Sequence, residues 1–378
     1  MTADTVGGVW TYALDLAAAL ARRRVRVVLA TMGAAPSPEQ RRAALAIGGV
    51  ELYESVYRLE WMDDPWEDVQ RAGDWLLGLE RRVRPDVIHL NGYVHAGIAW
   101  QAPVIVVGHS CVLSWWEAVK GEPAPARFDR YAAEVARGLR AASVVVAPSA
   151  AMLRSLSRNY GRHPTTLVIP NGRDLDRSGA AQAASATQPP RLMPHGSKEP
   201  FVFCAARLWD EAKNALTLAD AAIGLEWPVV LAGDPVNPST GERRHFDHVR
   251  LLGRLDGAAM GRWLARAAVY ASPARYEPFG LSVLEAALAG CALVLGDLPS
   301  LRELWNDAAV FVQPGSAAQL RQVLSRVAAD DRLREALALR ARARALNLSA
   351  TRMAERYHAA YQYLVSAGRA EGVSPAAA

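Results

Sequence analysis

Short apolar runs alternate with segments of helical periodicity along the first half of the chain. Helical patterns cover residues 8–20 and 38–47, and residues 142–156 combine an apolar run with a helix that Ser149 is expected to cap. The other apolar runs occupy residues 24–32, 86–92, 103–110 and 165–172. Strands that alternate with helices indicate a parallel sheet with helices on both faces.

The alternation stops between residues 175 and 200, where Ala, Ser, Gly and Pro dominate and no period is visible. We expect a linker or mobile loop there. Apolar runs followed by helical or turn-like segments resume at residues 201–208, 228–234, 249–255, 267–273 and 291–297. The pattern predicts an α/β protein with two Rossmann-like, doubly wound domains that face each other across a cleft at the carboxyl ends of their strands.

The pattern and the length of 378 residues place the first domain at residues 1–174 and the second at 201–348, joined by the linker 175–200. Residues 349–378 form a C-terminal helix and a tail that we expect to be disordered. At the other end, only Met1–Asp4 remain for a central strand before the glycine pair. We therefore expect either an internal start or a clipped strand that costs stability.

Composition is that of a soluble protein, with 51% hydrophobic and 21% charged residues. We see neither a run of about 20 apolar residues nor a signal sequence, and we expect a cytoplasmic protein. The cysteines Cys111, Cys204 and Cys291 are too scattered for a zinc site or a disulfide framework. The net charge of +5 is modest and scattered, so we expect no nucleic-acid partner and at most peripheral membrane contact.

The stretch YEPFGLSVLEAALAG places Glu277 and Glu285 on either side of a predicted helix start. A helix N-terminus attracts anions such as phosphate. Ser282 and Glu285 also fit a capping box, in which case Glu285 is structural. That alternative leaves Glu277 unexplained.

Two cations follow the apolar run 201–208 in the segment RLWDEAK. Arg207 and Lys213 lie at the carboxyl end of a predicted strand, where they could reach the loop of Glu277. Only three of the 43 basic residues are lysines, which makes Lys213 an unusual choice. Two cations beside a helix N-terminus suit a diphosphate leaving group without a metal ion.

Together, the segments GGVWTYALDLAAAL, VIPNG, ARLWDEAKN, VVLAGD and YEPFGLSVLEAALAG resemble the retaining glycosyltransferases of family four, which have the GT-B fold. The resemblance spans nearly the whole chain in the right order, and the spacing of Glu277 and Glu285 matches the E-x7-E signature of that family. Five residues separate Arg207 from Lys213, where many members have four. The loop between them should therefore bulge.

The resemblance implies roles for residues of the second, nucleotide-sugar-binding domain. Glu277 would contact hydroxyls of the donor sugar, and Glu285 would hold the ribose of the nucleotide. Arg207 and Lys213 would bind the diphosphate. The turn Phe279, Gly280 and Leu281 would complete the cradle with backbone N–H groups.

The resemblance makes the first domain the acceptor-binding one and implies that the C-terminal helix within residues 349–378 crosses back to it. In this domain His109 matches a histidine that lines the sugar pocket. Gly7 and Gly8 match a glycine loop that approaches the donor closely. Weaker acceptor candidates are His89, Asn91, Trp115 and Trp116. For His89 a packing role is equally compatible with the sequence, and single buried tryptophans are common.

The resemblance thus predicts a hexosyltransferase that uses a nucleotide diphosphate sugar and retains the anomeric configuration, in polysaccharide or glycoconjugate biosynthesis. The acceptor would be a glycan, a lipid-linked sugar or a small metabolite. No cofactor or metal is expected, because DLD at residues 174–176 fits turn chemistry better than a metal site. The alternatives are a sugar-nucleotide 2-epimerase of the same fold and a non-catalytic two-domain sugar-binding protein.

Overall fold

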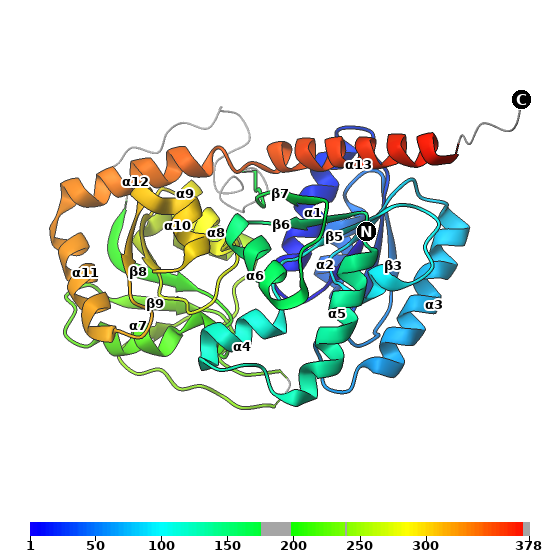
Figure 1. The fold of residues 1–378 in the computed structure, drawn as a ribbon. Helices are drawn as coiled ribbons and strands as arrows, with labels where there is room; N and C mark the ends of the chain where they lie inside the picture. The colour runs from blue at the N-terminus through cyan, green and yellow to red at the C-terminus, as the bar shows by residue number, and fades with distance from the viewer. Residues whose placement is uncertain (175–197, 239, 373–378) are drawn as a thin grey trace, which may run out of the picture. The chain divides into compact units, whose positions relative to one another are not determined.

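The computed structural model describes residues 1–174, 198–238 and 240–372, which belong to two compact units (Figure 1). The N-terminal unit contains residues 1–117 and 122–172 and the chain from Ala350 onward. The C-terminal unit contains residues 118–121 and 173–349. Each unit is a parallel sheet covered by helices, so the predicted α/β class with two Rossmann-like domains is confirmed.

The N-terminal unit has two groups of parallel strands, in the orders β1-β2-β3 and β4-β5-β6-β7. The strands are β1 (Thr2–Asp4), β2 (Val27–Met32), β3 (Val50–Glu54), β4 (Ile88–Leu90), β5 (Val104–Val107), β6 (Val144–Ala147) and β7 (Thr166–Val168). Asn91 joins the two groups, because its backbone N–H donates to Thr2 Oγ1 at 2.9 Å and its side-chain amide donates to the Thr2 carbonyl at 2.7 Å. The central strand β1 has only three residues, and the side chain of Asn91 links it to β4.

Helices from both ends of the sequence cover this sheet. They are α1 (Gly8–Ala21), α2 (Pro38–Leu45), α3 (Trp66–Val83), α4 (Val112–Lys120), α5 (Asp129–Ala141), α6 (Ala150–Tyr160) and α13 (Ala350–Gly372). Ser149 caps α6 as predicted, since its hydroxyl accepts from the Met152 N–H at 3.2 Å. The helix α13 packs on α1 through Tyr357 against Tyr12, with ring centroids 6.1 Å apart.

The C-terminal unit has one six-stranded parallel sheet in the order β10-β9-β8-β11-β12-β13. Its strands are β8 (Glu199–Ala205), β9 (Val229–Ala232), β10 (Arg250–Leu251), β11 (Ala267–Ser272), β12 (Ala292–Gly296) and β13 (Ala309–Val312). The chain fills one side of β8 and then crosses to β11 on the other side. A ligand site in such a sheet lies at this switch point, outside the carboxyl ends of β8 and β11.

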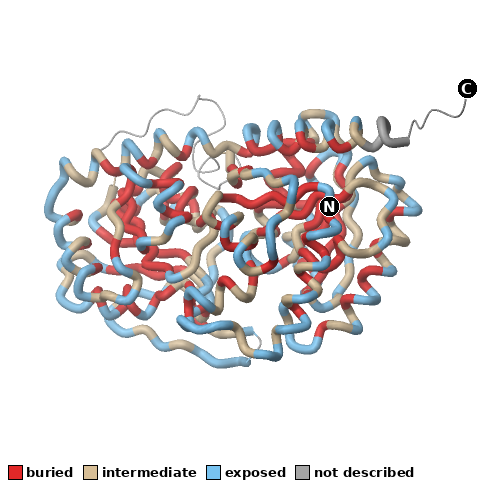
Figure 2. Tube along the Cα trace, in the orientation of Figure 1, coloured by how far each residue is buried: buried red, intermediate tan, exposed pale blue. Residues whose placement is uncertain are grey.

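The helices of this unit bury both faces of the sheet. They are α7 (Ala215–Ala222), α8 (Gly257–Arg266), α9 (Leu281–Leu288), α10 (Pro299–Trp305), α11 (Ala317–Ala329) and α12 (Asp331–Ala345). Phe203 and Tyr270 belong to the core on one face, and Val202 and Val269 belong to the core on the other. Figure 2 shows the interior of this unit as buried chain; β9, β11 and β12 are buried at every residue, as the continuous apolar runs predict, whereas the edge strand β10 is exposed.

Two boundaries differ from the sequence prediction. The strand β8 begins at Glu199, inside the segment that we assigned to the linker, because Glu199 still pairs with Ala267 of β11. The helix α13 continues to Gly372, into the predicted tail. The rest of the linker, 175–197, lies outside the described residues. Within the described residues, no helix combines the length and the apolar composition that a membrane crossing requires.

Candidate donor-binding site

The predicted cation and carboxylate loops meet at the switch point of the C-terminal sheet. Lys213 follows β8, Glu277 follows β11, and the Lys213 Nζ lies 2.7 Å from the Glu277 Oε2. Their side chains are 18% and 13% exposed. The fold therefore holds the two groups together in a partly buried ion pair at the sheet edge where ligands bind.

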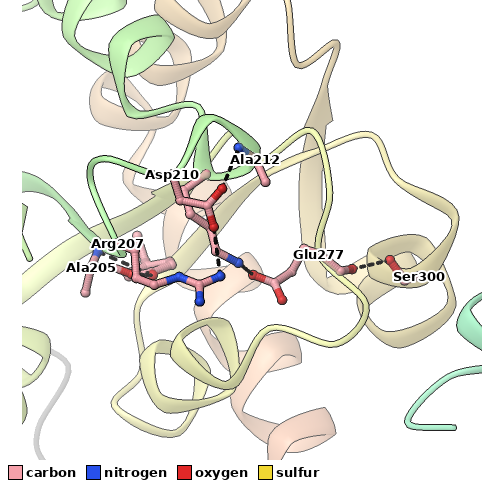
Figure 3. Close-up of polar contacts among 8 residues, drawn as sticks. Ala205, Arg207, Asp210, Ala212, Glu277 and Ser300 are labelled. Carbon is pink, nitrogen blue, oxygen red and sulfur yellow. Dashed lines mark hydrogen bonds and ion pairs between the residues drawn. The ribbon is translucent and has the colours of Figure 1, made fainter. Parts of the chain in front are cut away.

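Arg207 also follows β8 and lies near this ion pair. Its Nη2 contacts the Asp210 Oδ2 at 2.8 Å, and Asp210 Oδ1 accepts from the Ala212 N–H at 3.0 Å. Figure 3 shows Arg207 and Glu277 pointing toward one another. The chain between Arg207 and Lys213 contains a 3₁₀ turn, Glu211–Lys213, that Asp210 caps. The bulge expected from the five-residue spacing stays a prediction.

Asn214 anchors the Lys213 loop, a role that sequence analysis missed. Its backbone is left-handed, with φ 55°, and its side-chain amide donates to the Pro273 carbonyl at 2.8 Å and to the Pro314 carbonyl. Its side-chain oxygen accepts from Thr217 Oγ1 at 2.8 Å. One buried amide thus ties the loop after β8 to the ends of β11 and β13. The signal in the sequence is an Asn directly after the lysine, because Asn tolerates the left-handed conformation better than most residues.

The start of α9 overturns the capping-box alternative. Gly280 occupies the N-cap position with φ 88°, and the helix begins at Leu281, so Ser282 lies inside the first turn and cannot cap it. A Cβ at Gly280 would lie 3.0 Å from Val283 Cγ2, in a backbone conformation that L-residues rarely adopt. Ser282 and Glu285 therefore do not form a capping box, although their spacing fits one.

Glu285 instead forms an ion pair with Arg173, whose Nη1 lies 2.8 Å from Glu285 Oε1. Sequence analysis did not predict the Arg173 contact.

In β11, the buried Tyr270 hydroxyl donates to the Ala205 carbonyl at 3.1 Å. Burial raises the pKa of Tyr270 well above its usual value, and the nearby charges of Cys204 and Glu285 add to the effect. The phenol therefore stays neutral beneath the site.

Each predicted donor-binding acid thus has its own cation, Lys213 for Glu277 and Arg173 for Glu285. Arg207 adds a cation whose side chain is 46% exposed. Among the described residues no group of three or more His, Cys, Asp or Glu side chains could hold a metal ion. Asp174 is described, whereas Leu175 and Asp176 of the DLD pattern are not. The side chains present can bind a diphosphate by direct charge.

The backbone of Glu277 is also fixed from α10. The Ser300 hydroxyl donates to the Glu277 carbonyl, as Figure 3 shows. Ser300 is buried, and it follows the proline that opens α10. This bond holds the β11–α9 loop between two helices without using the carboxylate of Glu277.

The N-terminal unit carries its predicted residues at its own switch point, beside β1 and β4. Asn91 Oδ1 lies 2.9 Å from His109 Nε2 and 3.2 Å from His89 Nε2. Since the amide nitrogen of Asn91 donates to Thr2, its oxygen accepts from both rings. Both histidines are therefore Nε2–H tautomers, and His89 Nδ1 accepts from the Tyr361 hydroxyl at 2.6 Å.

This network favours the packing role for His89, which is only 3% exposed. Asn91 likewise serves the join between β1 and β4. Gly7, with φ 86°, is exposed at the N-terminus of α1, and its contact with the donor stays a prediction. Trp115 and Trp116 are partly buried side by side, with ring centroids 5.7 Å apart, and their acceptor role stays a prediction.

The two networked histidines predict a pH-dependent stability. Burial lowers the pKa of His109 from 6.5 to about 4 and that of His89 well below its usual value. The unfolded chain therefore binds more protons in this window, so the free energy of unfolding should fall as the pH drops from 6.5 toward 4. His109 alone contributes on the order of 3 kcal/mol. Denaturant unfolding of wild type and His109→Gln between pH 7 and about 4.5 measures this.

The glutamine variant keeps a donor for Asn91 but cannot titrate, so its stability should vary less with pH. Replacing the exposed His245 by glutamine controls for loss of a histidine in general. Equal pH dependence in wild type and His109→Gln would contradict the prediction.

Comparison with known proteins gives matches to both units. Residues 6–177 match the family model of Glycosyltransferase Family 4, and residues 199–330 match that of Glycosyl transferases group 1. The chain is 29% identical to the glycogen synthase of Mycobacterium tuberculosis over 280 residues, which is 68% of this chain and 64% of that protein. The match thus spans less than two thirds of that relative's length.

Solved structures agree at the level of the fold. The sucrose-phosphate synthase of Thermosynechococcus elongatus has a TM-score of 0.75 at 20% identity, covering 97% of this chain and 96% of that one. HepE of Anabaena, solved with UDP and glucose, has a TM-score of 0.69 at 18% identity, covering 96% of this chain and 100% of that one. With both family models matched in order, the chain belongs to the family-four glycosyltransferases of GT-B fold.

Proposed function

We propose that the chain transfers a hexose from a nucleotide diphosphate sugar to an acceptor hydroxyl, with retention at the anomeric carbon and without a metal ion. The observation that carries the proposal is the contact of Lys213 with Glu277 at the switch point, where Arg207 also points toward Glu277. Cations of the kind that bind a diphosphate lie beside a carboxylate of the kind that binds sugar hydroxyls, which supports the proposal. HepE was solved with UDP and glucose, which supports a donor of this class.

The residues divide the donor between them in this proposal. Arg207 and Lys213 bind the diphosphate, aided by the N–H groups at the start of α9. Lys213 must then share its charge between Glu277 and the phosphates. Glu277 accepts from sugar hydroxyls, and Glu285 accepts from the ribose hydroxyls.

In the reaction, the bond between the anomeric carbon and the diphosphate oxygen breaks. The acceptor oxygen bonds to the same face of that carbon, and its proton passes to the departing diphosphate. Arg207 and Lys213 stabilise the negative charge that develops on the leaving group. Glu277 stabilises the positive charge that develops on the sugar ring. His109 carries no charge near pH 7, because burial lowers its pKa to about 4.

A thermal-shift panel of UDP, GDP, ADP, CDP and dTDP tests the proposal. A nucleotide diphosphate at about 100 times its dissociation constant adds roughly 2.7 kcal/mol to the stability of the unit that binds it. We expect one or two members to raise the melting temperature, and the corresponding monophosphates to act more weakly because they lack one phosphate. No response to any diphosphate would contradict the proposal. Conversion of a nucleotide sugar without any acceptor would indicate the epimerase alternative.

A further inference from the structure

Arg173 lies where the chain passes from the N-terminal to the C-terminal unit. The first unit ends at Gly172, and the chain returns to it at Ala350. The Arg173 N–H donates to the Leu348 carbonyl at 3.0 Å, which joins the outgoing and returning segments. This bond fixes the backbone of Arg173 beside α9, so that its side chain reaches Glu285 from a defined position.

The two side chains of the Arg173–Glu285 ion pair are buried to different extents. The arginine side chain is 10% exposed and the glutamate side chain is 19% exposed, so the guanidinium is the more deeply buried partner. Arg173 Nη1 contacts Oε1 of the carboxylate at 2.8 Å. A carboxylate has two oxygens and about four acceptor positions, which leaves capacity for hydroxyl donors while Arg173 is bound.

We propose that Arg173 is a positioning residue that presents Glu285 to the ribose of the donor nucleotide and thereby sets the preference for ribose over deoxyribose. This rests on the proposed function of the site. A glutamate side chain has several rotamers, and an ion pair that fixes one of them places the carboxylate before the ligand arrives. The vicinal hydroxyls of ribose can both donate to a carboxylate held in this way. A 2′-deoxynucleotide loses one of those bonds.

The test compares the dissociation constants of UDP and 2′-deoxy-UDP, and of GDP and 2′-deoxy-GDP, by isothermal titration. Hydrogen bonds to charged groups contribute enough to give the wild type roughly a tenfold preference for the ribonucleotide, or more. Arg173→Met keeps the aliphatic packing but removes the donors, and Arg173→Ala is measured beside it. We expect the preference to shrink to about twofold in both variants and to recover in part in Arg173→Lys.

Glu285→Gln supplies the second arm. In that background Arg173→Met should change the preference little further, because the two residues act through one carboxylate. Arg334→Ala is the matched control, since Arg334 is 18% exposed and donates to the Val327 carbonyl at 3.0 Å on α11 and α12. It should lower the melting temperature without changing the preference.

A folded Arg173→Met variant that keeps the wild-type preference overturns the proposal, whatever its melting temperature. If Arg173→Met fails to fold, Arg173→Ala decides, because it also removes the charge that holds Glu285, and a wild-type preference there overturns the proposal. Absence of nucleotide binding by the wild type itself would instead contradict the proposed function.

Discussion

Glu277→Gln should lower kcat/KM for sugar transfer roughly a hundredfold or more while the nucleotide diphosphate still binds. The substitution keeps the shape of the side chain but removes its negative charge. In the proposed reaction that charge stabilises the positive charge on the sugar ring in the transition state. It also releases Lys213, whose Nζ lies 2.7 Å from the carboxylate, for the diphosphate. Steady-state kinetics and titration with the diphosphate that binds wild type measure the two effects separately.

The fold should survive this change, because Ser300 holds the backbone carbonyl of Glu277 and does not use its carboxylate. Glu199→Gln is the control, since it removes a carboxylate from an ion pair with Arg266 at the amino end of β8. Transfer at the wild-type rate by Glu277→Gln would remove Glu277 from the reaction. Loss of diphosphate binding would mean that the residue is needed for the shape of the site.

Arg207→Ala should reduce kcat roughly a hundredfold to a thousandfold, and a chelator should leave the wild type active. Both results follow if fixed cations replace a divalent ion at the diphosphate. Activity measured with and without excess EDTA, for wild type and variant, tests them together. Activity that EDTA abolishes and manganese restores would contradict metal independence and redirect attention to residues 174–176.

Arg266 offers a close control for Arg207. Its side chain is 49% exposed, compared with 46% for Arg207, and each arginine forms an ion pair with a carboxylate. Each also lies over a tryptophan, Arg207 over Trp209 at 5.5 Å and Arg266 over Trp263 at 4.9 Å. Arg266 is at the amino end of the sheet, so Arg266→Ala should preserve activity. A similar loss in both variants would indicate a general effect of losing an arginine.

The fold class could be predicted because buried parallel strands leave a strong signal in the sequence. The run PVIVVGHS contains β5 (Val104–Val107), which is buried throughout. The contact of Lys213 with Glu277 was also within reach, since both follow strand ends that the alternation predicts to share one edge of a sheet. What these patterns give is local spacing along the chain.

Contacts between segments that are distant in the sequence could not be predicted from these local patterns. Arg173 and Glu285 are 112 positions apart, and Asn214 bonds to carbonyls at positions 273 and 314. The capping box failed for a related reason, because the entry of the chain at Gly280 decides where α9 begins. The rarity of lysine does not by itself indicate a ligand site, because the Lys198 ammonium donates to the carbonyls of Leu264 and Ala289, at the amino end of β8.

The return of the chain to the N-terminal unit at Ala350 has a consequence for folding during synthesis. Tyr361 contacts His89, and Tyr357 packs on Tyr12, so these aromatic contacts form only after α13 has been translated. Between Gly172 and Tyr361 the ribosome adds 189 residues, which takes roughly 10 to 40 s. The C-terminal unit, nearly continuous in sequence, is complete before then. The unit that leaves the ribosome first therefore finishes folding last, with the α13-binding face of α1 uncovered in the interval.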